Sequence, residues 1–154
     1  MTIERVLPDG EADLTLAEFK LWVPRRGHPQ ATDYWDGNWL EITAAYMTKH
    51  CIALCDGNVL HGTDVVASLD AARRMHETLD GTFSFASLDP GFELLFTALK
   101  QGQIQVDTRI VTEDNADWSG EYRRRQLIDQ SYLPALIGGL TRIVSRFPIV
   151  GKPA

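Results

Sequence analysis

Only two stretches of this sequence, 63–79 and 133–147, repeat apolar residues at the three- and four-residue spacing of an amphipathic helix. Most of the remaining chain alternates apolar and polar residues, which is the period of a half-buried strand. The strand-type segments follow one another directly, and the βαβ alternation of a parallel sheet is absent from the sequence. This order predicts an α+β fold and argues against a doubly wound nucleotide-binding sheet.

Strand-type segments lie on both sides of the first helical stretch. We expect strands at 13–23, 39–48, 51–55, 82–88, 92–100, 103–112 and 121–128. Short turn sequences, among them those at 89–91 and 101–102, predict an antiparallel meander after the first helix. We therefore expect a single antiparallel sheet of about six to seven strands with both helices packed on one face.

Three local features interrupt the alternating pattern. The apolar alternation changes phase within 13–23, which predicts a β-bulge near Ala17 or Glu18. The Asp-Gly-Asn step at 56–58 is typical of a tight turn with positive φ angles. The segment 24–38 contains glycine and proline and almost no periodicity, so we expect it to be a long surface loop.

The first helix has recognisable end signals. Thr63 and Asp64 are suitable N-caps, and Gly81 is the expected C-terminal stop. Its predicted apolar face consists of Val65, Leu69, Ala72, His76 and Leu79. We expect His76 to lie at the edge of the core rather than to act as a base.

The second helix carries the stronger apolar stripe. Its members are Leu133, Leu136, Ile137, Leu140, Ile143, Val144 and Phe147. Asp129 or Ser131 should cap its start, and Pro148 should mark its end. Gly138 and Gly139 lie inside this helix, where each costs about 1 kcal/mol relative to alanine. Their presence predicts the close approach of another backbone, from the first helix or from a partner.

Length and composition describe an ordinary folded domain. The 154 residues fit one domain, 1–154, with 44% apolar and 23% charged residues. The formal charge of -6 argues against nucleic acid or an anionic membrane as the partner and favours a basic one. The N-terminus lacks a signal-peptide pattern, and the apolar runs fall short of the roughly 18 residues of a membrane span. We therefore expect a cytoplasmic protein.

One cluster contains metal-ligand residue types: His50, Cys51, Cys55 and His61. In the expected strand, the rise of about 3.3 Å per residue separates the two thiols by roughly 13 Å, which is too far for a disulfide. Zinc motifs bring cysteine pairs together through tight turns, and a strand prevents this. We therefore expect reduced, buried thiols and no bound metal.

The sequence offers no catalytic constellation. Neither cysteine adjoins a glycine turn of the oxyanion-hole type, and a glycine-rich phosphate loop is absent from the sequence. Carboxylates are numerous, but the sequence singles out no pair for acid-base catalysis. These observations favour a protein that is not an enzyme and that needs no cofactor.

A polar stretch at 113–120 is expected to form the loop of a hairpin. Its acidic residues are Glu113, Asp114 and Asp117. They lack the spacing of a calcium-binding loop, so we expect a solvated acidic loop. Trp118 in this loop either folds back over the sheet edge or serves as an interface anchor. The basic run 123–125 should be divided between the two faces of a strand and pair with nearby acids.

Three short motifs carry a family resemblance: Asp33-Tyr34-Trp35-Asp36-Gly37-Asn38-Trp39-Leu40, Asp129-Gln130-Ser131-Tyr132-Leu133, and Phe147-Pro148. With the order of elements between them, the chain resembles the WapI family of bacterial immunity proteins from about Phe19 to Pro148. The resemblance implies protection of a cell from a contact-delivered toxin whose C-terminal domain is a tRNA-cleaving nuclease. Several matched residues also have structural interpretations as helix caps and turns, and no toxin-contacting residue is carried over.

The first functional hypothesis is a binding protein. A nuclease that binds RNA presents a basic groove, and the carboxylates of an acidic inhibitor can occupy the phosphate positions in it. The expected contact residues are Glu113, Asp114, Asp117 and Trp118. In this hypothesis the chain is a cytoplasmic antitoxin, and its partner is the cognate basic nuclease toxin domain.

Two other hypotheses remain open at the level of sequence. The chain could be a small enzyme or ligand-binding protein that uses a cleft under the 24–38 loop, with Asp33, Trp35 and Asp36 lining it. It could also be a domain whose function is self-association. The genes beside this one would discriminate, because a large secreted protein with a variable C-terminus favours the immunity hypothesis and a metabolic operon favours the enzyme.

Overall fold

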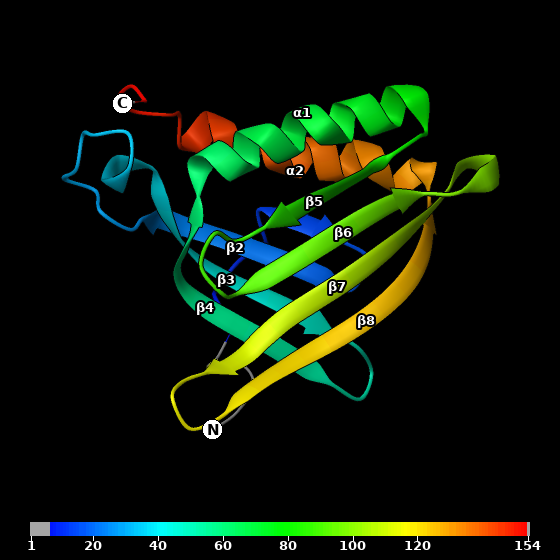
Figure 1. Cartoon of the computed structure of the whole chain (residues 1–154), viewed down its shortest axis with the longest axis horizontal. Coiled ribbons are helices and arrows are strands. Elements are labelled where there is room, and N and C mark those ends of the chain that lie inside the picture. Colours follow the sequence, from blue (N-terminus) through cyan, green and yellow to red (C-terminus); the bar gives the residue numbers. More distant parts are fainter. Residues whose placement is uncertain (1–6, 154) are drawn as a thin grey trace.

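The computed structural model describes residues 7–153, so the expectation that the chain carries no N-terminal signal peptide falls partly outside the described residues. Within this range the chain forms eight β-strands in two four-stranded antiparallel sheets, together with two α-helices (Figure 1). The α+β class is thereby confirmed, but the predicted single sheet of about six to seven strands is wrong. In the described range, neither helix is long and apolar enough to cross a membrane.

Each sheet is a meander in which consecutive strands pair. The first sheet contains β1 (Leu14–Leu16), β2 (Phe19–Arg26), β3 (Trp39–Met47) and β4 (Ile52–His61). The second contains β5 (Thr82–Ala86), β6 (Phe92–Ala98), β7 (Gln103–Asp114) and β8 (Ser119–Asp129). The antiparallel meander predicted for the C-terminal strands is confirmed.

In the sequence, helix α1 (Gly62–Thr78) lies between the strands of the first sheet and those of the second. It begins where β4 ends and carries the chain across the molecule to β5, which then pairs with β6 and not with β4. Hairpin connections pair the four strands before the helix with one another and the four strands after it with one another. Periodicity shows which residues of a strand are buried but not which sheet the strand joins, so it does not distinguish one sheet from two.

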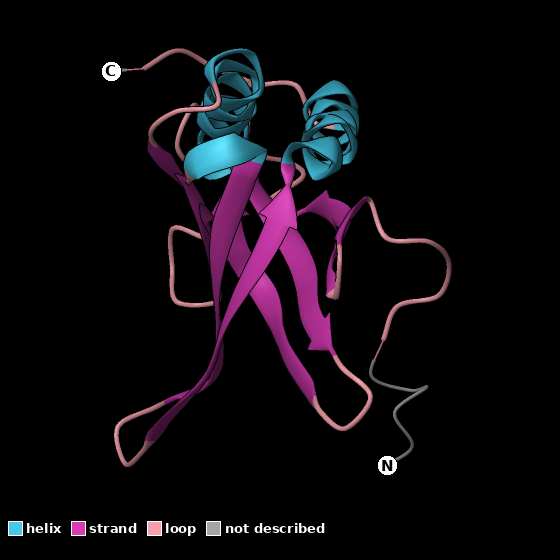
Figure 2. Ribbon diagram, turned by 90° about the vertical axis from the view of Figure 1, so that its right-hand side faces the viewer, coloured by secondary structure: helices cyan, strands magenta, loops and turns pink. Residues whose placement is uncertain are grey.

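The two sheets face each other and share one apolar core. Phe19 of β2 and Phe92 of β6 lie with ring centroids 5.6 Å apart, and Tyr46 of β3 and Tyr122 of β8 lie at the same distance. Figure 2 shows α1 and the second helix side by side across one opening between the sheets. Both helices therefore cover one side of the molecule, but they close a two-sheet sandwich and do not cover the face of a single sheet.

The phase change between residues 13 and 23 marks a hairpin turn and not the predicted bulge. β1 ends at Leu16 and β2 begins at Phe19, and these two residues pair across a turn in which Ala17 has a φ of 50°. A two-residue turn reverses the chain and restarts the alternation, so both strands still direct their apolar residues into the core. The connections predicted at 89–91 and 101–102 are found, the second as the 3-10 turn η3 (Lys100–Gly102).

The Asp-Gly-Asn step at 56–58 lies inside β4, so the predicted tight turn is wrong there. Gly57 has a φ of 141°, and the register with β3 shifts next to it, where Glu41 pairs with Asn58 and Leu40 with Leu60. The extra residue on β4 is Val59, which forms a β-bulge two residues after Gly57. The hairpin turn lies earlier, at 48–51.

Helix α1 begins before the predicted caps. Its first residue is Gly62 and its N-cap is His61, which makes no side-chain capping bond. Thr63 and Asp64 therefore lie in the first turn, and the Thr63 hydroxyl is hydrogen-bonded to the His61 ring at 2.6 Å.

The C-terminal end and the buried face of α1 also differ from the prediction. Leu79 takes a left-handed conformation with φ 50°, and its N–H donates to the Met75 carbonyl at 2.7 Å. Gly81, the predicted stop, lies two residues further on. His76 is exposed, so its predicted place at the core edge is wrong, because the buried stripe of the helix passes through Ser68 and Met75 instead.

Helix α2 (Leu133–Arg146) begins after a 3-10 turn, η4 (Gln130–Tyr132). The Asp129 carboxylate caps this turn by accepting a hydrogen bond from the Ser131 N–H at 2.8 Å. The N-cap of α2 itself is Tyr132, which makes no side-chain capping bond, so neither predicted residue caps the α-helix directly. Gly139 faces β1, where an added Cβ would lie 2.9 Å from Leu14 Cβ and 3.1 Å from Leu14 Cα. The predicted close approach is confirmed at Gly139, and the backbone that approaches it belongs to β1 and not to α1.

We predict that alanine has opposite effects at the two glycines of α2. A Cβ at Gly138 would meet only the Arg142 guanidinium at 3.7 Å, so Gly138→Ala should stabilise the fold by about 1 kcal/mol through helix propensity. Gly139→Ala should destabilise it by about 1–3 kcal/mol, because the new methyl group overlaps Leu14. Urea denaturation measures both changes. Equal stabilisation by the two substitutions would contradict the contact between α2 and β1.

Candidate functional site

The predicted acidic contact residues lie at the tip of the β7–β8 hairpin. β7 continues to Asp114 and β8 begins at Ser119, so the loop is shorter than the predicted 113–120 and Glu113 and Asp114 belong to the end of a strand. All four predicted contact residues are exposed: Glu113, Asp114, Asp117 and Trp118. The structure thus brings them together at one end of the molecule.

Asn115 organises the tip of this hairpin. Its Oδ1 accepts hydrogen bonds from the N–H groups of Asp117 at 2.9 Å and Trp118 at 3.1 Å. The Asn115 N–H in turn donates to the Trp118 carbonyl at 3.2 Å. The Trp118 side chain is 63% exposed, so of its two predicted positions the one over the sheet edge is wrong.

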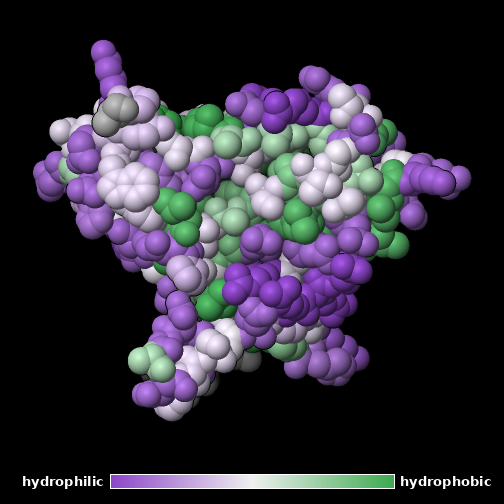
Figure 3. Space-filling model, viewed as in Figure 1, coloured by the Kyte–Doolittle hydropathy of each residue, from purple (hydrophilic) through white to green (hydrophobic). Residues whose placement is uncertain are grey.

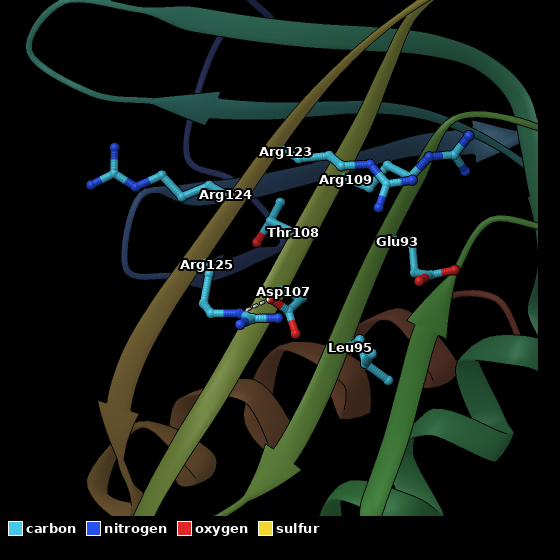
Figure 4. Close-up of a pocket in the computed structure, with 8 residues that line it drawn as sticks. All are labelled: Glu93, Leu95, Asp107, Thr108, Arg109, Arg123, Arg124 and Arg125. Atoms are coloured by element: carbon cyan, nitrogen blue, oxygen red, sulfur yellow. Dashed lines mark hydrogen bonds and ion pairs between the residues drawn. The ribbon is translucent and has the colours of Figure 1, made fainter.

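The arginine run of β8 is divided between the two faces of its sheet, as predicted. On the outer face the Arg125 Nε donates to Asp107 Oδ1 at 2.7 Å (Figure 4). Arg109 and Arg123 both pair with Glu121. Hydrogen bonds from these two arginines lower the pKa of Glu121. The outer face is strongly hydrophilic (Figure 3), but its three arginines are paired with acids of the same chain.

Arg124 lies on the other face of β8, near the ring of Tyr46. Its guanidinium carbon is 5.9 Å from the centroid of that ring. The Tyr46 hydroxyl donates to Gln126 Oε1 at 2.8 Å, and Gln126 Nε2 donates to the Glu18 carboxylate at 2.9 Å. Burial, followed by the charge of Glu18, raises the pKa of Tyr46 to about 12. This group connects the two sheets and keeps the phenol protonated, so it stabilises the fold and does not form a catalytic acid-base pair.

The inner side of the 24–38 loop is filled by the chain itself. Asn38, at the end of the 3-10 turn η2 (Asp36–Asn38), is buried and donates to the carbonyl groups of Tyr34 at 2.6 Å and Val150 at 3.0 Å. It also accepts a hydrogen bond from the Val150 N–H at 3.0 Å. The C-terminal segment therefore lies against this loop. The residues predicted to line a cleft there are all exposed: Asp33, Trp35 and Asp36.

An aromatic cluster around His61 fixes the same loop to the end of β4. The imidazole is 1% exposed, and its Nε2 lies 2.9 Å from the Trp35 carbonyl oxygen. Because a carbonyl oxygen only accepts, Nε2 is the donor. The Trp35 ring stacks on the imidazole with centroids 5.1 Å apart, and Trp39 meets it edge to face at 5.3 Å. The pattern of the sequence did not reveal this role of His61, because its partners belong to a distant segment.

The residues considered for zinc lie apart. Cys51 is exposed in the turn before β4, Cys55 is half-buried in the strand, and His61 belongs to the aromatic cluster. Residues 7–153 contain no group of three or more His, Cys, Asp or Glu side chains that could hold a metal ion. Both cysteines are free, and the expectation of burial is wrong for Cys51.

The two thiols should differ in reactivity. Burial raises the pKa of Cys55 to about 12, so at about pH 8 the thiol is almost entirely protonated and unreactive. We predict that iodoacetamide modifies Cys51 but not Cys55 in the native protein, and that both react in urea. Peptide mass spectrometry after a short labelling pulse measures this. Comparable native labelling of the two cysteines would contradict the position of Cys55 in β4.

One known protein family matches almost the whole chain. The model of the immunity protein WapI-like family matches residues 12–148, a range that includes all the strands and both helices described above. No curated protein and no solved structure matches the chain. The chain belongs to the WapI-like family of immunity proteins, as its motifs indicated. Membership makes it an immunity protein and implies a protein toxin as its partner.

Proposed function

We propose that this chain neutralises a nuclease toxin domain by placing the tip of its β7–β8 hairpin in the basic groove of the toxin. The family match over residues 12–148 carries the proposal, because immunity proteins act by binding a toxin. The inhibitor acts in the cytoplasm, where a tRNA-cleaving toxin meets its substrate. It blocks access of RNA to the toxin and leaves the toxin chemically unchanged.

The shape of the hairpin supports this proposal. Its tip projects beyond the body of the sandwich (Figure 1), so it can enter a concave site on another protein. Glu113, Asp114 and Asp117 are exposed there, and the ion pairs within residues 7–153 involve other carboxylates. Carboxylates that take part in no ion pair of their own chain can occupy the phosphate positions of a basic groove.

Electrostatics and the exposed indole have different roles in such a complex. The net charge of -6 steers a basic partner toward the inhibitor and accelerates association at low salt. Trp118, 63% exposed between carboxylates, offers apolar area that becomes buried only in the complex. Charges at the rim therefore set the association rate, and the indole slows dissociation.

The proposal requires no catalytic group in this chain. The side chains whose pKa is raised to about 12 are Tyr46, which is hydrogen-bonded between the sheets, and Cys55, which is half-buried in β4. Neither is placed to act on a substrate at the hairpin. β8 is an edge strand of the second sheet and carries the run Arg123 to Arg125. Such charges oppose strand pairing between two copies of the chain.

We predict that the amide variant Glu113→Gln/Asp114→Asn/Asp117→Asn associates about tenfold more slowly with the toxin at low salt, because it lacks the steering charges at the tip. The measurement uses an inactivated form of the toxin domain encoded beside this chain, together with growth rescue on co-expression.

The matched control changes three exposed acids of the α1 region, with the substitutions Asp70→Asn, Glu77→Gln and Asp80→Asn. Both triple variants change the formal charge from -6 to -3, so only the position of the lost charge differs. The control should retain near wild-type association. Equal effects of both variants, or of neither, would remove the hairpin from the interface, and failure of the wild-type chain to bind the toxin would overturn the immunity proposal.

A further inference from the structure

A second exposed tryptophan lies away from the hairpin, in the part of the predicted 24–38 loop that lies between the end of β2 and η2, the 27–35 loop. The Trp35 side chain is 56% exposed, although one face of its ring stacks on the buried His61. Large exposed indoles are uncommon on a protein surface and are enriched among the residues that dominate binding energy. The sequence gives Trp35 acidic neighbours on both sides, Asp33 and Asp36, just as Trp118 follows Asp117.

The local structure holds Trp35 in place before any partner binds. The Asp33 carboxylate accepts from the Asp36 N–H at 2.9 Å, and the Asp33 carbonyl accepts from the Gly37 N–H at 2.9 Å. The Trp35 carbonyl is held by His61 Nε2 at 2.9 Å. Because the indole is already ordered, its burial against a partner costs little side-chain entropy.

A continuous series of contacts connects the hairpin to this loop along one side of the molecule. At the base of the hairpin, the Val111 N–H donates to the Gly91 carbonyl at 2.7 Å. From the same β5–β6 turn, the N–H groups of 88–89 donate to the Val59 carbonyl of β4 at 2.9 and 3.2 Å. Two residues further along β4 lies the histidine that supports Trp35. Figure 1 shows the loop, the turn and the hairpin at the same side of the molecule.

Acidic side chains outnumber basic ones on this side, where the Arg26 guanidinium at the base of the loop donates to the carbonyl groups of Gly37 and Pro148. Asp33, Asp36 and Asp89 are exposed, and in the described part of the chain the ion pairs involve other carboxylates. Arg25 and Arg109, which also flank this side, are each paired with a glutamate of a neighbouring strand. The outer face of the second sheet, in contrast, has its arginines and acids matched with one another. This side therefore fits a basic protein surface.

We propose that the toxin-binding surface extends from the β7–β8 hairpin across the β5–β6 turn to the 27–35 loop, with Trp35 and Trp118 as its two apolar anchors. The inference rests on the proposed function, and its occupant is the same basic nuclease domain. The hairpin enters the groove, and Trp35 packs against the toxin surface beside it. A partner that contacts both anchors buries two indoles whose positions the chain already fixes.

The test measures dissociation of the inactivated toxin domain from three single-site variants. Trp35→Ala and Trp118→Ala should each increase the dissociation rate about tenfold or more. Leu127→Ala is the control, because Leu127 is an equally exposed apolar side chain, at 57%, on the outer face of β8. The Leu127→Ala variant should dissociate from the toxin domain at the wild-type rate.

A fourth variant separates loss of contact from loss of loop structure, because Trp35→Ala also removes the stacking on His61. Asp36→Lys reverses an exposed charge beside Trp35 and should slow association at low salt with an unchanged unfolding midpoint. If Trp35→Ala and Asp36→Lys bind like the wild type while Trp118→Ala or the hairpin amide variant binds weakly, the extended surface is wrong and the hairpin proposal stands. If the wild-type chain does not bind the toxin domain, both proposals are wrong.

Discussion

The burial of two apolar sheet faces against each other is the interaction on which the rest of this structure depends. Each four-stranded sheet has one apolar face, and a single sheet of this size cannot remove that face from water alone. Two edge strands, β1 and β5, lie at one opening between the facing sheets. Helix α2 packs against β1 and helix α1 against β5, so the helices cover these edges. Gly139 allows α2 to approach Leu14 closely enough to close the core there.

This architecture decides which parts of the chain are available for a partner. Helices occupy one opening of the sandwich, and the outer arginines of the second sheet are neutralised by acids on the same face. The hairpin tip and the 27–35 loop keep their carboxylates free of ion pairs within the described residues and hold an exposed indole each. A family of immunity proteins on this fold can therefore vary these two loops without disturbing the core.

The sequence predicted much of the fold and less of the site. Alternation and helical spacing located both helices and the regions of the strands, because each pattern follows from the local geometry of the backbone. The same reasoning misjudged Ala17 and Gly57, since the sequence signals of a bulge and of a tight turn are similar, and only the fold shows where the chain continues. At the site, the polar composition of the segment 113–120 was enough to predict that Glu113 and Asp117 are exposed. The support of Trp35 by His61 could not be predicted in this way, because the two residues are 26 positions apart in the sequence and meet only in the folded chain.

The sequence by itself determined the α+β class, the buried face of α2, the division of the arginine run and membership in the immunity family, because these depend on periodicity and on short motifs. The tertiary structure alone decided that the strands form two sheets, that β1 is the backbone against Gly139, and that the 27–35 loop and the β7–β8 hairpin lie on one side of the molecule. The physical reason is that side-chain pattern reports burial within a segment, whereas the pairing of segments depends on how the whole chain removes its apolar surface from water.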